Sequence, residues 1–144
     1  MKRILYIIIG VTLMMTGCNK EDSNNGNLDG FWQMTEMRNK SNASTSDMRS
    51  LGITWAFQGH ILELRDVKKD NQDIIMSFSL VGDKLNLSAP YIVDRDSDDI
   101  QIDDVDLLIP YGIDKNTTEY SVLELTSSRM VLDNDAWYLV FRKY

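Results

Sequence analysis

The 144-residue sequence is poor in cysteine, histidine and basic side chains: it contains one Cys and one His. A single cysteine excludes an internal disulfide framework, a paired-cysteine zinc site and an iron–sulfur cluster. A single histidine excludes any metal site built on two histidines, and with it the common zinc hydrolase designs. Lys and Arg number 15 against 22 acidic residues, for a net charge of −7. This argues against nucleic acid as a partner, because phosphate binding needs basic residues gathered on one face. We expect no cofactor.

The N-terminus has the design of a secretory signal. Lys2 and Arg3 precede an apolar run over residues 4–15, and small residues follow it. The run is too short to cross a bilayer, which needs about 20 apolar residues. We therefore expect residues 1–17 to be a signal peptide.

The exit from this run, Met15-Thr16-Gly17-Cys18, resembles the lipobox of bacterial lipoproteins, with Met where Leu is usual. The resemblance implies diacylglyceryl transfer to the Cys18 sulfur, cleavage before Cys18 and acylation of the new amine. Two or more acyl chains anchor a protein stably to a membrane. The alternative is an unlipidated signal peptide with a stray cysteine.

A polar run follows the lipobox and predicts a flexible tether over residues 18–27. It opens with Asn19-Lys20-Glu21-Asp22, which resembles the surface-export signal of Bacteroidetes lipoproteins. That resemblance implies a location in the cell envelope, anchored to the outer membrane and displayed outward. A solvated tether has the same composition, so a periplasmic orientation stays open.

Residues 28–144 are long enough for one domain and alternate between apolar and polar side chains with a period of two. The clearest hairpin has Ile74 to Leu80 returning as Leu85 and Leu87 across a Gly82-Asp83 turn, where glycine accepts positive φ freely. Residues 39–50 are polar and predict a loop or a short helical turn. No later segment carries a convincing helical stripe. Seven or eight short strands at hairpin spacing predict an all-β fold, a single small antiparallel up-and-down β-barrel.

The start of the domain, Gly30-Phe31-Trp32, resembles the Gly-x-Trp signature of lipocalins. In that family the Trp closes the base of the barrel and an Arg from the last strand lies across it, which implies stacking of Arg142 on Trp32. The whole of 28–144 is similar to the small lipocalin-like lipoproteins of gut Bacteroidetes, and the Leu107–Ile113 stretch contributes to the similarity. The Thr-Asp-Tyr turn of lipocalins and any disulfide are absent.

Several large apolar side chains are expected to point into the barrel. Small barrels either fill their interior with side chains or hold one small ligand. A packed core is the favoured interpretation, and a cavity for an apolar guest is the alternative. The candidate lining residues are Trp32, Met34, Trp55, Phe57, Met76, Phe78, Trp137 and Phe141.

The most unusual stretch is acidic. Asp94, Asp96 and Asp98 have the spacing that opens an EF-hand loop, and Ca²⁺ prefers several carboxylate oxygens brought together in this way. The rest of the loop departs from that pattern, with Asp99 where Gly is needed and Val105 where a bidentate Glu is needed. The two interpretations are a divalent-cation site and a solvated acidic loop.

These features predict a protein that is not an enzyme. His60, beside Gly59, is expected to be an exposed turn residue, and no Gly-x-Ser-x-Gly elbow is present. The leading hypothesis is a lipid-anchored binding module for a small apolar or amphiphilic ligand, with the mouth of the barrel gated by loops around 39–50 and 90–118. The second is a solid barrel that binds an envelope protein or polysaccharide. The third is a small hydrolase built on His60 or on two carboxylates.

Overall fold

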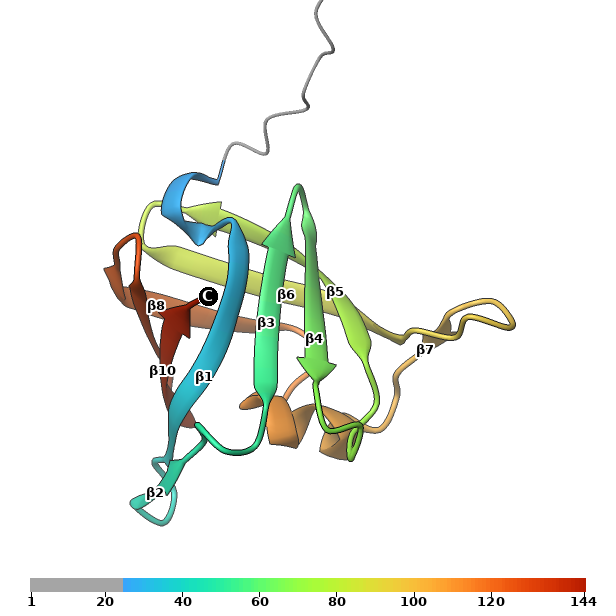
Figure 1. Ribbon diagram of the computed structural model, residues 1–144, viewed down its shortest axis with the longest axis horizontal. Helices are drawn as coiled ribbons and strands as arrows, with labels where there is room; N and C mark the ends of the chain where they lie inside the picture. Colours follow the sequence, from blue (N-terminus) through green and yellow to red (C-terminus); the bar gives the residue numbers. More distant parts are fainter. Residues whose placement is uncertain (1–24) are drawn as a thin grey trace, which may run out of the picture.

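The first and last strands of the domain pair with each other and close a barrel (Figure 1). The computed structural model describes residues 25–144. Its elements, in chain order, are η1 (Gly26–Leu28), β1 (Gly30–Asn39), β2 (Ser44–Asp47), β3 (Ile53–Gln58), β4 (Ile61–Asp66), β5 (Ile74–Val81), β6 (Lys84–Ile92), β7 (Ile100–Gln101), η2 (Val105–Tyr111), β8 (Thr118–Leu125), β9 (Arg129–Asp133) and β10 (Trp137–Lys143).

The barrel is antiparallel throughout and its wall has eight strands. The hydrogen-bonded order is β1-β3-β4-β5-β6-β8-β9-β10, and β10 returns to β1. The short strands β2 and β7 lie outside this ring, paired with β1 and β6 respectively. The predicted all-β barrel is therefore confirmed. Closure leaves the wall without the unpaired strand edges on which other chains could add.

Neighbouring strands run in opposite directions, so at each end of the barrel some strands begin and their neighbours end. We call the base the end at which β1 begins, where β4, β6 and β9 also begin and β3, β5, β8 and β10 end. We call the opposite end the mouth. Helix η1 lies at the base (Figure 1). The expected tether reaches the described residues only at 25–27, where the Asn25 side-chain amide donates to Gly59 O at 2.9 Å.

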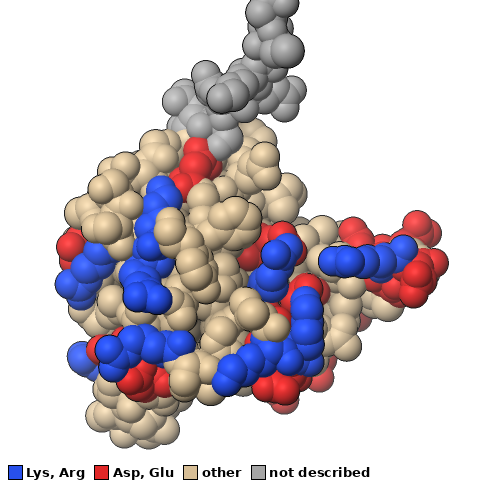
Figure 2. All heavy atoms as spheres, viewed as in Figure 1, with Lys and Arg blue, Asp and Glu red and all other residues tan. Residues whose placement is uncertain are grey.

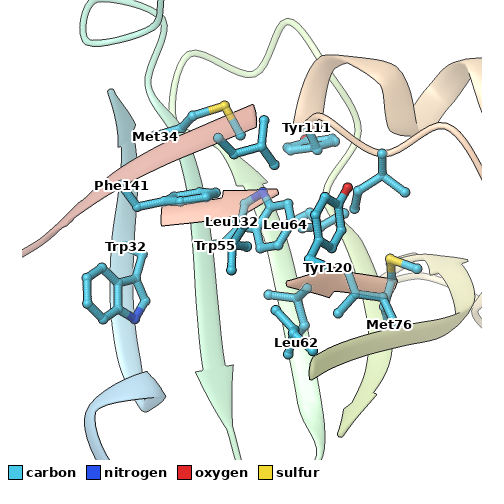
Figure 3. Close-up of a cluster of buried hydrophobic side chains, with 14 of the residues drawn as sticks. Trp32, Met34, Trp55, Leu62, Leu64, Met76, Tyr111, Tyr120, Leu132 and Phe141 are labelled. Atoms are coloured by element: carbon cyan, nitrogen blue, oxygen red, sulfur yellow. The ribbon is translucent and has the colours of Figure 1, made fainter. Parts of the chain in front are cut away.

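Alternation along the strands explains the core. In β5, Ile74, Met76 and Phe78 are buried while Ser77 and Ser79 are exposed. The β5–β6 hairpin has the predicted register, with Leu80 opposite Leu85. Figure 3 shows aromatic and aliphatic side chains from opposite walls meeting inside the barrel.

Two elements differ from the sequence expectations. Residues 44–47 form strand β2, although the sequence predicts a polar loop or short helical turn there. All four residues are exposed, so they show no alternation of burial, and only their pairing with the second half of β1 makes them a strand. Residues 105–111 form the 3₁₀ helix η2, which contains Pro110 and has no helical stripe. A 3₁₀ helix of this length repeats every three residues and shows no 3.6-residue period. In the described part of the chain neither helix is long and apolar enough to cross a membrane.

Candidate functional site

The side chains that the sequence predicts to face inward fill the interior of the barrel. All eight candidate lining residues are buried, and none is more than 6% exposed. Trp55 lies at the centre, with its ring centroid 5.0 Å from Phe141, 6.1 Å from Tyr120 and 6.2 Å from Phe57 (Figure 3). A side chain with no accessible surface adjoins no void large enough for water, so these residues form a packed core.

The mouth is covered by η2 and the residues after it. Leu108, Tyr111 and Ile113 are fully buried. The Tyr111 hydroxyl donates to Gln72 O at 2.6 Å, which ties η2 to the β4–β5 loop. Burial, with the negative charges of two nearby aspartates, raises the pKa of Tyr111 far above its ordinary value, so the phenol stays a hydrogen-bond donor. Within the predicted gating loop 90–118, this segment occupies the mouth.

Gly112 allows η2 to sit this deeply. Its φ is +77°, in the left-handed region that glycine adopts without strain. A Cβ atom at this position would lie 2.7 Å from Cδ2 of Leu139 on β10. The Tyr120 hydroxyl donates to the carbonyl oxygen of Gly112, and burial raises the pKa of Tyr120 above its ordinary value. The turn after η2 is therefore fixed against the barrel wall.

At the base, Trp32 is fully buried and its indole N–H donates to Leu28 O at 2.8 Å. The cation over its ring is Lys143, whose Nζ lies 5.0 Å from the ring centroid. The expected stacking of Arg142 is wrong. Arg142 pairs with Gln33 in the β1–β10 register, one residue out of step with Trp32, and its Nε donates to Gln33 Oε1 at 2.8 Å. Adjacent strand residues face opposite sides, so only Lys143 can reach the indole.

The expected cation site at Asp94, Asp96 and Asp98 is not formed. Within residues 25–144 no three acidic, His or Cys side chains are arranged to hold a metal ion. Asp94 instead accepts hydrogen bonds within its own turn, from the Ser97 hydroxyl and from the backbone N–H of Asp96. These bonds, that of Ser97 first, lower the pKa of Asp94. The alternation that resembles an EF-hand stabilises a turn of an acidic loop.

His60 lies exposed in the β3–β4 turn, as the sequence predicts. Its backbone carbonyl accepts from the N–H of Phe78. In the described residues its imidazole forms no hydrogen bond or ion pair with an acid, so the orienting partner that a catalytic histidine needs is missing there.

Sequence reasoning missed a groove on the outer wall near the base. This basal groove, of about 600 Å³, runs along Phe31, Ala56 and Ile61 between Asp29 and Glu63. Phe31 is 54% exposed and Ile61 47% exposed. Figure 2 shows largely uncharged surface over the adjoining ends of β1, β3 and β4. A second hollow of about 250 Å³, lined by Ile75 and Tyr91, begins on the other side of Ile61.

Two further pockets are lined by polar residues and are smaller than the basal groove. One, of about 280 Å³, lies between β1 and β2 and is lined by Thr35, Ser46 and Arg49. Another, of about 170 Å³, lies between the start of β8 and the β9–β10 turn. Neither combines an apolar wall with polar groups that converge on one point, the usual design of a small-molecule site.

Comparison with known proteins agrees with the geometry. A family model described as a lipocalin-like domain matches residues 13–144. The fold is similar to that of a lipocalin-like protein from Bacteroides uniformis, at 17% identity and a TM-score of 0.62, over 83% of this chain and 100% of that one. It is also similar to an uncharacterised protein from Bacteroides eggerthii, at 18% identity and a TM-score of 0.54, over 81% and 99% of the two chains. No curated protein matches. The chain belongs to the family of lipocalin-like domains.

Proposed function

We propose that this protein is a lipid-anchored, non-catalytic binding module of the cell envelope, and that it binds a partner protein through its outer surface. The lipobox-like Met15–Cys18 segment supports the anchor and an outer-membrane location. Both are inferred from sequence, because Cys18 and the export-like residues 19–22 lie outside the described residues. The lipocalin-like fold supports a binding role.

One observation carries the proposal: the interior of the barrel is occupied. With the eight inward residues packed and η2 covering the mouth, the contact surfaces that remain are the outer wall and the loops. A packed barrel is a rigid support, and binding residues on a rigid support are commonly carried by its loops.

The mouth-end loop between β6 and η2 is the surface best suited to a partner. Residues 94–106 contain seven Asp and one Arg, and Figure 2 shows acidic side chains gathered where this loop projects. Ile100, within this loop, and Ile109, in η2 just after it, are exposed. Such a surface is complementary to a protein face that carries Lys and Arg around an apolar centre. A neutral polysaccharide would gain nothing from the concentrated charge.

Pull-down from detergent-treated envelopes tests this role. The full chain is compared with a variant in which Asp96, Asp98 and Asp103 are replaced by Asn, and with a matched control that carries D70N, D83N and E119Q. All six acids are exposed. We expect one reproducible partner protein that is retained by the control, lost from the loop variant and released by salt, because exposed charges are screened. Equal capture by both variants would contradict the proposal.

A second candidate function is capture of a small apolar or amphiphilic ligand inside the barrel. One observation favours it: the indole N–H groups of Trp55 and Trp137 are buried and have no hydrogen-bond partner in the described structure. A ligand with an acceptor oxygen would satisfy them if the packed side chains moved to admit it. Native mass spectrometry of the purified protein decides between the two functions, since the packed interior predicts the bare mass and an additional bound mass would favour capture.

A further inference from the structure

The base of the barrel combines a fixed chain path, exposed apolar side chains and basic groups. We propose that it is a membrane-docking surface that rests on the bilayer into which the lipid anchor inserts. This proposal rests on the proposed lipid modification of Cys18. It adds an orientation of the domain, base toward the lipid and mouth away from it.

The chain enters the barrel at the base and is held there. Asn25 donates from its side-chain amide to Asp29 Oδ1 at 2.8 Å and to Gly59 O at 2.9 Å, which fixes the start of the described chain beside the β3–β4 turn. Cys18 is seven residues earlier. A fully extended chain of that length spans at most about 25 Å. The base is therefore the part of the domain that a lipid on Cys18 would hold closest to the membrane.

Exposed apolar side chains lie at this end beside the basal groove. Of the nine large apolar side chains that are exposed in the described residues, five belong to residues at or near strand ends of the base, and the other four lie toward the mouth. The basal groove continues the apolar surface up the outer wall along Ala56. Water contact is unfavourable for these groups, and insertion among lipid headgroups and upper acyl chains would remove it. The five residues are Phe31, Ile61, Val81, Leu123 and Tyr144.

Charged side chains also differ between the base and the mouth. The base carries four basic residues, Lys84, Arg129, Arg142 and Lys143, and four acidic ones, Asp29, Glu63, Asp83 and Glu124, so it has no net charge. The loop with seven Asp lies after β6, whose last residue is at the mouth. The molecule is thus polarised between a neutral base and an acidic mouth, and an anionic membrane would repel the mouth but not the base.

Two other occupants fit the apolar surface less well. A second copy of the chain, docked base to base, would turn one of the two bases away from the membrane that holds its proposed Cys18 lipid. The cationic partner protein proposed for the acidic loop would meet a base with no excess of acidic residues. A lipid surface would take up the five apolar side chains, and the neutral base brings no net negative charge against it.

Site-directed fluorescence tests the orientation. The full chain, lipidated at Cys18, is reconstituted in vesicles of phosphatidylethanolamine and phosphatidylglycerol. Lipidation leaves an introduced cysteine as the only free thiol. A nitrobenzoxadiazole label is placed by Gln58→Cys at the base or by Ser46→Cys at the mouth, both exposed positions. We expect doxyl-labelled lipid to quench the base label and iodide to quench the mouth label. Iodide quenching of both labels would overturn the docking, and a base label shielded from both quenchers would indicate a protein contact instead.

A matched pair of variants tests the apolar side chains themselves. F31S with I61S removes two base side chains, whereas L51S with V67S removes two exposed apolar side chains at the mouth. We expect only the first pair to expose the base label to iodide. No change with the first pair would overturn the proposal, and far-ultraviolet circular dichroism checks that both variants are folded.

Failure of the lipid anchor gives a different result from failure of docking. Vesicle flotation reports the anchor alone, and a chain that does not float contradicts the proposed function. In that case residues 1–17 are replaced by a hexahistidine tag that binds nickel-chelating lipid, and the two labels are compared again. Lipid quenching of the base label under this tether supports docking, and iodide quenching of it overturns docking whatever the state of Cys18.

Discussion

The Lys143 side chain makes two contacts that stabilise the base of the barrel. Its ammonium lies over the Trp32 ring and donates to Asn27 O at 2.9 Å. A partly exposed cation–π contact is worth about 0.5–1 kcal/mol. We predict that Lys143→Met lowers the free energy of unfolding in urea by about that amount. Lys115→Met, at an exposed position with no ion pair in the described structure, is the control. An equal effect in both variants would show that only general charge is involved.

Asp66 makes stability depend on acid. It is 1% exposed, and its carboxylate accepts from Lys68 N, from Asn71 N and from the Asn71 amide. Burial alone would raise its pKa, but these hydrogen bonds outweigh burial and lower the pKa below the ordinary 3.8. A lowered folded-state pKa stabilises the fold above the unfolded pKa. This contribution is lost as pH falls through the folded value.

We predict that Asp66→Asn lowers the free energy of unfolding at pH 7 by about 1–3 kcal/mol, since a buried acceptor is exchanged for a donor. Below pH 4 the difference from wild type should shrink, because protonation removes the same charge from the wild-type chain. Urea titrations between pH 2 and pH 7 measure this, with Asp70→Asn in the same loop as control. A pH-independent difference would assign the loss to packing alone.

Among the elements, η2 depends most on a few contacts for its place over the mouth. We predict that Tyr111→Phe, which leaves Gln72 O without its hydroxyl partner, costs about 1 kcal/mol. Amide hydrogen exchange should rise most across residues 105–113. Tyr91→Phe, on the outer wall, is the control. Uniform acceleration over the whole barrel in the Tyr111 variant would mean that η2 does not open as a local unit.

How far the elements can be predicted depends on whether their burial is periodic. β5, β6 and β10 are read directly from alternate apolar residues, since each buries one face. β2 buries nothing, so only its pairing with β1 reveals it. The candidate surfaces are harder still. Phe31 and Ile61 each read as ordinary strand residues, and they line one groove only because registers across three strands bring them together.

For the whole molecule, membrane attachment is expected to depend on one sulfur. We predict that Cys18→Ala moves the protein from the membrane fraction to the soluble fraction, because stable anchoring requires acyl chains. Density-gradient flotation measures this, with Ser23→Ala in the same predicted tether as control. Continued flotation of the Cys18 variant would show that another part of the chain holds the membrane.

The pairing of β1 with β10 closes the barrel, and it can form only after β10 has been synthesised. Thr35 donates a hydrogen bond to Val140 O, and 105 residues separate them in the chain. A ribosome delivers β1 well before its closing partner, so the nascent chain carries an open sheet edge until β10 has been made. Truncation anywhere before Trp137 would remove β10 and uncover two strand edges at once. Partial chains of this protein should therefore aggregate instead of forming smaller stable barrels.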